Sequence, residues 1–202
     1  MRAENMSEEM HIGISYQEDI PKDFIDEFSE TVYEPRLQLR VESRPRGFYA
    51  SIEWALPTLV IAYLAKPYFE GFLQEAGRDH YQALKKGILQ LTSRLYGKNP
   101  ERRDRKRSLL FSAMASLQDG RSLKFVFPEG VSVEKYEVAV DSMYSLLSAH
   151  FQFYPVDSVT EIAEKLSTPS RSLYFEFDPE QETWILLDPL LEAQKEHEKQ
   201  IR

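Results

Sequence analysis

The sequence predicts an α+β fold, in which mostly antiparallel β-hairpins alternate with helices and the helices cover one face of the sheet. Pairs of alternating apolar segments begin near residues 36, 108 and 171, and segments with helical spacing separate them. Glycine is scarce, with 8 among 202 residues, so no flexible linker is evident. We therefore expect a single α+β domain over residues 11–190, preceded by a disordered N-terminus over residues 1–10 and followed by a charged C-terminal helix over residues 191–202 that frays.

The first quarter of the chain predicts a strand, a helix and a hairpin. Apolar residues alternate over residues 11–16, which is the period of a half-buried strand. Pro21 can occupy the first turn of a helix that runs to about residue 31, because its missing N–H is not needed there. Apolar and polar residues then alternate over 36–43 and 47–55, and the residues between them suit a turn. These two segments predict the first hairpin.

Two helices are expected next. Pro57 opens the first of them, and residues 58–65 form its buried body. Gly77 ends this helix, as glycine often does after a last helical turn. Asp79 caps the second, whose apolar residues follow helical spacing up to residue 95.

The second hairpin is predicted over residues 109–117 and 123–127, because Asp119-Gly120 separates two apolar alternating runs. A long helix follows over about residues 132–153. A short helix comes after it, with Asp157 as its cap.

The third hairpin is expected from residues 171–177 and 183–187, which alternate around a turn at Asp178-Pro179-Glu180. Asp188 then caps the last helix, with Pro189 in its first position.

Composition and motifs argue against several classes of enzyme. The chain has no cysteine, which excludes disulfides, thiolate metal sites and cysteine nucleophiles. No phosphate-binding glycine motif and no hydrolase or metalloprotease motif is present. No spacing of histidines and carboxylates fits a metal site, so we expect no metal and no cofactor. The charged N-terminal residues are unlike a secretory signal, so we expect a cytoplasmic protein.

A run of uncharged residues over 54–65 raises the question of a membrane. A spanning helix needs about 20 apolar residues, and a shorter run is more often a buried core helix. We therefore expect a core helix. A membrane-active stretch over 54–73 is the alternative.

Charge is concentrated in two segments of opposite sign. Residues 94–107 hold seven cations and two anions, a net charge of +5, in a chain whose total is −8. Such a patch can bind phosphate or nucleic acid. Residues 18–34 hold seven anions and one cation, a net charge of −6, which suits contact with the basic segment within the chain or between copies. The candidate anion-binding residues are Arg102, Arg103, Arg105, Lys106 and Arg107, and the candidate interaction residues are Asp23, Asp26, Glu27 and Glu30.

The cluster Asp79-His80-Tyr81 has the residue types of general acid–base catalysis. Adjacent residues of a helix point about 100° apart, however, so Asp79 is poorly placed to orient His80. A capping Asp79 and a packed Tyr81 explain the motif without chemistry. His150 lies in an aromatic helix end and reads as a packed histidine. We therefore assign no catalytic residue.

The sequence thus favours a non-enzymatic cytoplasmic binding protein that acts through protein contacts or self-association. Binding of an anionic ligand through residues 94–107 and membrane activity of residues 54–73 are the alternatives. No feature of the sequence identifies the partner or the ligand.

Overall fold

The structure is a computed structural model, and it describes residues 10–45, 58–72, 78–97, 99–104, 106–164 and 171–187. The expected N-terminal tail (apart from its last residue, Met10), the turn and second strand of the first predicted hairpin, and the C-terminal helix lie outside these residues.

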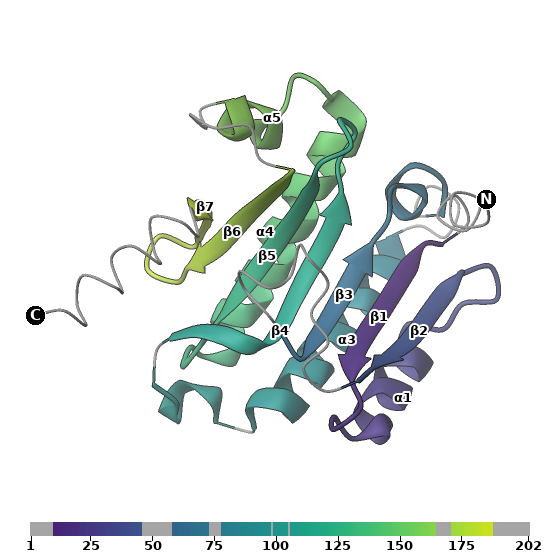
Figure 1. Cartoon of the computed structure of the whole chain (residues 1–202), viewed down its shortest axis with the longest axis vertical. Coiled ribbons are helices and arrows are strands. Elements are labelled where there is room, and N and C mark those ends of the chain that lie inside the picture. The colour runs from purple at the N-terminus through teal and green to yellow at the C-terminus, as the bar shows by residue number, and fades with distance from the viewer. Residues whose placement is uncertain are drawn as a thin grey trace, which may run out of the picture.

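A single seven-stranded sheet organises the described chain, in the order β2-β1-β3-β4-β5-β6-β7 (Figure 1). Its strands are β1 (Ile12–Gln17), β2 (Leu39–Arg44), β3 (Val60–Leu64), β4 (Lys106–Ser116), β5 (Ser122–Glu129), β6 (Ser172–Asp178) and β7 (Thr183–Leu187).

Parallel and antiparallel pairs alternate across this sheet, so the prediction of mostly antiparallel hairpins is wrong. The pairs β1–β2, β3–β4 and β5–β6 are parallel, whereas β1–β3, β4–β5 and β6–β7 are antiparallel. Each parallel pair is joined by a connection that contains a helix, as parallel strands require. The fold is α+β in content, with a mixed sheet.

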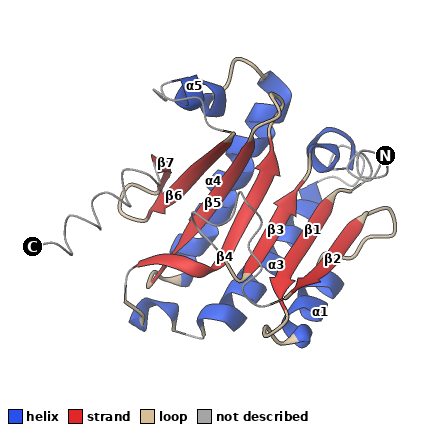
Figure 2. Ribbon diagram, viewed as in Figure 1, coloured by secondary structure: helices blue, strands red, loops and turns tan. Residues whose placement is uncertain are grey.

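The long helices lie on one side of the sheet, and Figure 2 shows them behind the strands. Two shorter turns of helix complete the described elements, a π-helix at Tyr68–Phe72 and a 3₁₀-helix at Pro100–Arg102. The α-helices are α1 (Lys22–Thr31), α3 (Arg78–Tyr96), α4 (Val133–Phe153) and α5 (Ser158–Glu164).

The first predicted hairpin is described only in its first strand, because residues 46–57 lie outside the described chain. Residues 39–44 form β2, which pairs with β1 in parallel through the α1 crossover. The second correction concerns residues 58–65, where we expected a helix. Val60–Leu64 is the strand β3, which lies between β1 and β4 and is buried except for a half-buried Tyr63. A strand buried on both faces loses the alternation that would have marked it as a strand.

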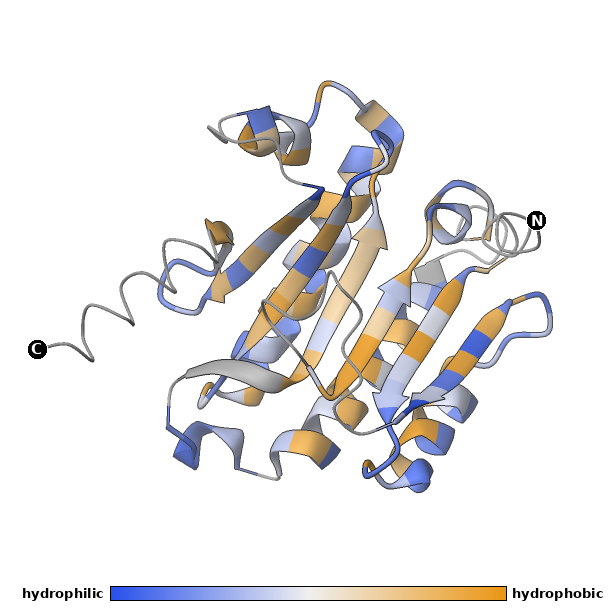
Figure 3. Cartoon of the chain, in the orientation of Figure 1, coloured by the Kyte–Doolittle hydropathy of each residue, from blue (hydrophilic) through white to orange (hydrophobic). Residues whose placement is uncertain are grey.

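The core fills the space between sheet and helices. Alternate strand residues, such as Ile14, Ala62 and Phe125, point toward the helices and are at most 1% exposed. Figure 3 shows the mixture of hydrophobic and hydrophilic residues along the strands. The opposite face of the sheet carries buried polar residues, among them Ser112 and Lys124.

Close packing of α1 on α3 depends on a glycine. A Cβ atom at Gly87, in α3, would lie 3.0 Å from Cγ1 of Val32 and 3.1 Å from Cδ2 of Phe28. The missing side chain therefore lets the two helices approach each other. This contact fixes the acidic helix α1 beside the start of the basic segment.

The two C-terminal hairpins are confirmed. β4 and β5 pair around Gly120, whose φ of +82° is a conformation that favours glycine. β6 and β7 pair across the turn at Asp178, whose carboxylate accepts backbone hydrogen bonds from Glu180 and Gln181. The long helix α4 and the short helix α5 also form where the sequence predicts them.

Candidate functional site

The candidate anion-binding residues do not form one open cluster in the described chain. Arg102 is exposed at the end of the 3₁₀-helix. Arg103 pairs with Glu129 at 2.9 Å and donates a hydrogen bond to the carbonyl of Tyr96. Arg105 lies outside the described residues, as do the side chains of Lys106 and Arg107, whose backbone begins β4.

The acidic helix contacts the basic segment within the chain. The guanidinium of Arg94 lies 3.1 Å from the carboxylate of Asp23 and 3.0 Å from that of Glu27, and it stacks over the ring of Phe24. Two of the four candidate interaction residues therefore serve the packing of α1 on α3. Asp26 pairs with Lys22 on its own helix, and Glu30 is exposed.

His80 has no nitrogen available for acid–base catalysis. Its Nε2 lies 2.9 Å from the carbonyl oxygen of Val32 and donates to it, so Nδ1 accepts from the Tyr68 hydroxyl at 3.1 Å. The ring is 6% exposed. Asp79 is exposed, and Tyr81 donates to Asp141 of α4. His80 and Tyr81 therefore make two separate structural contacts, and Asp79 lies in the first turn of α3, which begins at Arg78, and not before the helix as a cap.

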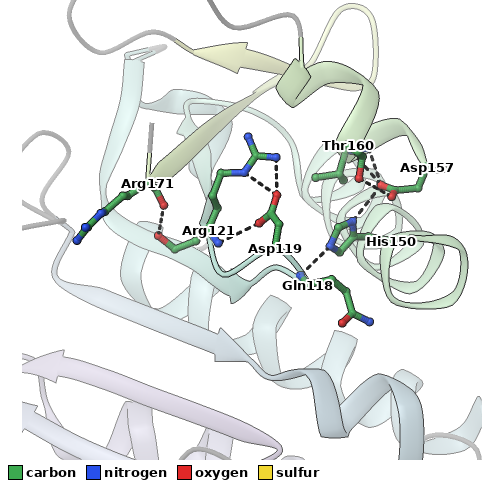
Figure 4. Close-up of polar contacts among 9 residues, drawn as sticks. Gln118, Asp119, Arg121, His150, Asp157, Thr160 and Arg171 are labelled. Carbon is green, nitrogen blue, oxygen red and sulfur yellow. Dashed lines mark hydrogen bonds and ion pairs between the residues drawn. The ribbon is translucent and has the colours of Figure 1, made fainter. Parts of the chain in front are cut away.

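A second histidine belongs to a buried polar network, which Figure 4 draws. His150 is near the end of α4, and its Nε2 accepts the backbone N–H of Gln118 from the β4–β5 turn at 3.1 Å. Its Nδ1 therefore carries the proton and donates to Oδ1 of Asp157 at 3.0 Å. Both side chains are 1% exposed.

Asp157 joins this network to the start of α5. The same carboxylate accepts hydrogen bonds from the backbone N–H groups of Val159 and Thr160 and from the Thr160 hydroxyl. This is the helix cap that the sequence predicts at Asp157. Burial acts to raise the pKa of the Asp157 carboxyl, but the hydrogen bonds from Thr160 and His150 outweigh it and hold the pKa below its ordinary value of 3.8.

An ion pair between Asp119 and Arg121 stabilises the β4–β5 turn, which contains Gln118. Asp119 accepts the backbone N–H of Arg121 at 2.9 Å and its Nε–H at 2.7 Å. These bonds hold the pKa of Asp119 below its ordinary value, against the opposing effect of burial. Arg171, in the strand connection beside this turn, accepts the backbone N–H of Ser122 at 3.0 Å (Figure 4).

A short and strongly apolar segment lies in the chain between His150 and Asp157. Phe153, the last residue of α4, is followed by Tyr154, Pro155 and Val156 before α5, and we call these four residues the apolar turn. Their exposed fractions are 54% for Phe153, 40% for Tyr154 and 84% for Val156. The peptide bond before Pro155 is cis.

A groove of about 420 Å³ lies against the apolar turn. Pro155 and Val156 form one part of its lining, and the exposed acidic residues Glu161 and Glu164 of α5 form another. An apolar wall beside two carboxylates suits a binding partner that has an apolar side chain next to a positively charged one.

The network does not have the arrangement of a catalytic base. A histidine oriented by a carboxylate is half of a catalytic triad, but Nε2 must then face a nucleophile or substrate. In this protein Nε2 of His150 is occupied by a backbone N–H, and the ring is 1% exposed. The geometry is therefore that of a structural clip between the β4–β5 turn and the apolar turn.

The described residues offer neither a metal site nor a membrane-spanning helix. Within these residues no group of three or more histidine and acidic side chains is placed to hold a metal ion. No helix in the described part of the chain is long and apolar enough to cross a membrane.

The sequence analysis identified His150 as a packed residue and missed the apolar turn. The sequence feature that could have indicated this turn is a run of four apolar residues, Phe153 to Val156, at a helix end where Pro155 stops the helix. Their exposure could not be read from composition, because such residues are usually buried.

Comparison with known proteins was made for the whole chain. No family model, no curated protein and no solved structure matches it.

Proposed function

We propose that this is a non-enzymatic binding protein that acts by contact with another protein, and that the apolar turn is its contact surface. The exposure of three large apolar side chains in one connection of four residues carries this proposal. Neighbouring exposed apolar side chains are typical of a protein-interaction site. Aromatic residues such as Phe153 and Tyr154 are enriched at the core of protein–protein interfaces.

The clip beneath the turn supports the same conclusion. His150 and Asp157 tie the ends of the turn to the β4–β5 turn and to α5 through buried hydrogen bonds. A surface that is already ordered loses less conformational entropy when it binds. The clip thus provides the preorganisation that a docking surface needs.

The groove beside the turn indicates the chemistry of the partner. Glu161 and Glu164 lie at its border, next to Val156. A partner segment with an aliphatic or aromatic residue and a neighbouring Lys or Arg would match both parts of this surface. We propose the cytoplasm as the place of this contact.

The alternative functions have less support from the described residues. Arg103 of the basic segment is already paired with Glu129. Val60–Leu64, within the stretch considered for membrane activity, is an inner strand of the sheet.

Photo-cross-linking in cells of the native host tests the proposal. Phe153 is replaced by a photoreactive phenylalanine analogue, and the same analogue at Tyr33, which is 74% exposed on another part of the surface, is the control. We expect a discrete protein adduct at position 153, its loss in the Val156→Asp variant, and no such adduct at position 33. Absence of an adduct at 153, or identical adducts at both positions, would refute the proposal.

A further inference from the structure

Two histidines lie on either side of one aromatic ring near the start of β1. The ring centroid of Phe72 lies 5.0 Å from that of His11, which directly precedes β1, and 4.6 Å from that of His80 in α3. His80 is buried, whereas His11 is half-buried. Neither histidine belongs to the surface of the proposed protein contact.

His11 holds the chain at the start of the edge strand β2. Its Nδ1 accepts the backbone N–H of Gln38, the residue before β2, at 3.0 Å. The backbone N–H of His11 donates to the carbonyl of the same residue, also at 3.0 Å. Because Nδ1 accepts, the proton of the neutral ring is on Nε2. The contact between ring and Gln38 therefore requires the neutral form of His11.

A second proton on His11 removes this contact. Both ring nitrogens of a protonated histidine are donors, and a backbone N–H cannot accept a hydrogen bond. His80 differs, because its Nδ1 bonds the hydroxyl of Tyr68, which can either donate or accept. Burial raises the pKa of Tyr68, so this hydroxyl keeps its proton. His11 is thus the member of the pair whose hydrogen bond depends on its protonation.

We infer that protonation of His11 releases the start of β2 from β1, so that this end of the sheet responds to mild acid. A histidine is suited to this role, because it is the side chain that ordinarily changes its charge between about pH 5 and pH 8.

The surroundings of His11 oppose the added charge. Burial lowers the pKa of its imidazole from the ordinary value of 6.5, and the nearby His80 lowers it further. The contribution of His11 to the free energy of unfolding is therefore complete above the unfolded pKa of 6.5 and is lost as the pH falls through the folded pKa. The release should accordingly occur below pH 6.5.

Charged side chains lie in the elements around the two rings, but they are directed to other partners. Lys66 pairs with Glu70 beside Phe72 at 3.4 Å, and Arg36 pairs with Glu34 before β2 at 3.5 Å. Asp79, next to His80 in α3, is exposed. Within the described part of the chain, no carboxylate bonds either imidazole and offsets a second proton.

The contact lies at the end of the sheet that supports the apolar turn. The start of β1 is at the same end as the β4–β5 turn, because β1 runs antiparallel to β3 and β3 runs parallel to β4. Glu70 of the π-helix accepts a hydrogen bond from the Gln118 side chain of that turn at 3.1 Å. An effect of pH on partner binding rests on the proposed function, whereas the release of β2 does not.

Amide hydrogen exchange of the full chain, followed by NMR at about pH 7.5 and about pH 5, tests the inference. The protection factor at each pH is the exchange rate relative to that of an unfolded chain at the same pH. The protection factor of the Gln38 amide should fall several-fold at the lower pH. The Gln17 amide, which donates to the Leu59 carbonyl at the other end of β1, is the control and should keep its protection. Equal protection of Gln38 at both pH values overturns the inference.

The His11→Asn variant separates this ring from the other effects of acid. Oδ1 of an asparagine can accept the Gln38 N–H in place of Nδ1, and it takes up no proton in this pH range. Gln38 should therefore be equally protected at both pH values in the variant, and a loss as large as in wild type would show that another group responds to acid. In the wild-type chain, the ring resonances of His11 and the Gln38 amide should titrate with one midpoint. Two different midpoints also overturn the inference, whether or not the variant folds.

Discussion

The Nδ1 atom of His150 lies 3.0 Å from Oδ1 of Asp157, and both side chains are 1% exposed. They are seven positions apart in the chain, and the apolar turn lies between them. Because the other nitrogen of His150 accepts the Gln118 N–H, this one pair joins α4, α5 and the β4–β5 turn. A change at Asp157 should therefore act on the whole end of the molecule that presents the apolar turn.

The Asp157→Ala variant should lower the free energy of unfolding by about 2–3 kcal/mol, because it removes both a helix cap and the acceptor of a buried hydrogen bond. Urea denaturation followed by circular dichroism measures this change. Glu164→Ala, an exposed position on the same helix, should shift it by less than about 0.5 kcal/mol. Equal effects of the two substitutions would show that the buried network contributes no particular stability.

The pH dependence of stability should identify the same carboxyl. The pKa of Asp157 is lower in the folded protein than its ordinary value of 3.8. Its stabilising contribution is therefore complete above the unfolded pKa and is lost as the pH falls through the folded pKa. The difference in unfolding free energy between wild type and Asp157→Asn should be constant from pH 7 to about pH 5 and should shrink below about pH 4. A difference that does not change down to pH 3 would contradict the ionised, hydrogen-bonded carboxylate.

His80 should behave as a structural residue. Its ring bonds Tyr68 and Val32 and lies 4.6 Å from the ring of Phe72 between centroids. His80→Ala should lower the free energy of unfolding by about 2–4 kcal/mol, since it leaves a cavity and removes two buried hydrogen bonds. Asp79→Ala, its exposed neighbour, should change stability by less than about 0.5 kcal/mol. Chemical denaturation compares the two, and a stable His80→Ala protein would contradict this role.

Two arginines of the basic segment should differ in how much they contribute to the free energy of unfolding. Arg103 pairs with Glu129, whose side chain is 3% exposed, whereas Arg94 pairs with the much more exposed Asp23 and Glu27. Arg103→Ala should cost about 2–3 kcal/mol of stability, because it removes a partner of the buried Glu129 carboxylate. Arg94→Ala should cost less than about 1 kcal/mol, and that cost should fall in high salt. Thermal melts of both variants at low and high salt test this order, which would be wrong if Arg94→Ala were the more damaging.

The sequence predicts the elements of this fold better than their pairing. The turn at Asp119-Gly120 and the cap at Asp157 are local signals, and both are confirmed. The partner of β2 is β1, which precedes it in the chain, and alternation within a strand carries no information about a parallel partner. Val60–Leu64 resembled a buried helix because both its faces are covered, which leaves no periodicity.

The candidate site was less predictable than the fold. Aromatic neighbours indicate that His150 is packed, but its polar partners lie 32 residues before it and 7 residues after it. Such a convergence depends on the packing of α4 against the end of the sheet. The seven cations of the basic segment gave the stronger signal in the sequence, yet Arg94 and Arg103 pair with acidic side chains of the same chain.

The apolar turn should bind a protein partner, and isothermal titration calorimetry measures this binding. The protein cross-linked at position 153 is purified and titrated with wild type, with Val156→Asp and with Tyr33→Asp. We predict that Val156→Asp weakens binding by about tenfold or more, since a charge replaces an apolar contact at the centre of the site, while Tyr33→Asp binds as wild type does. Equal affinities for wild type and Val156→Asp would contradict the assignment of the apolar turn as the contact surface.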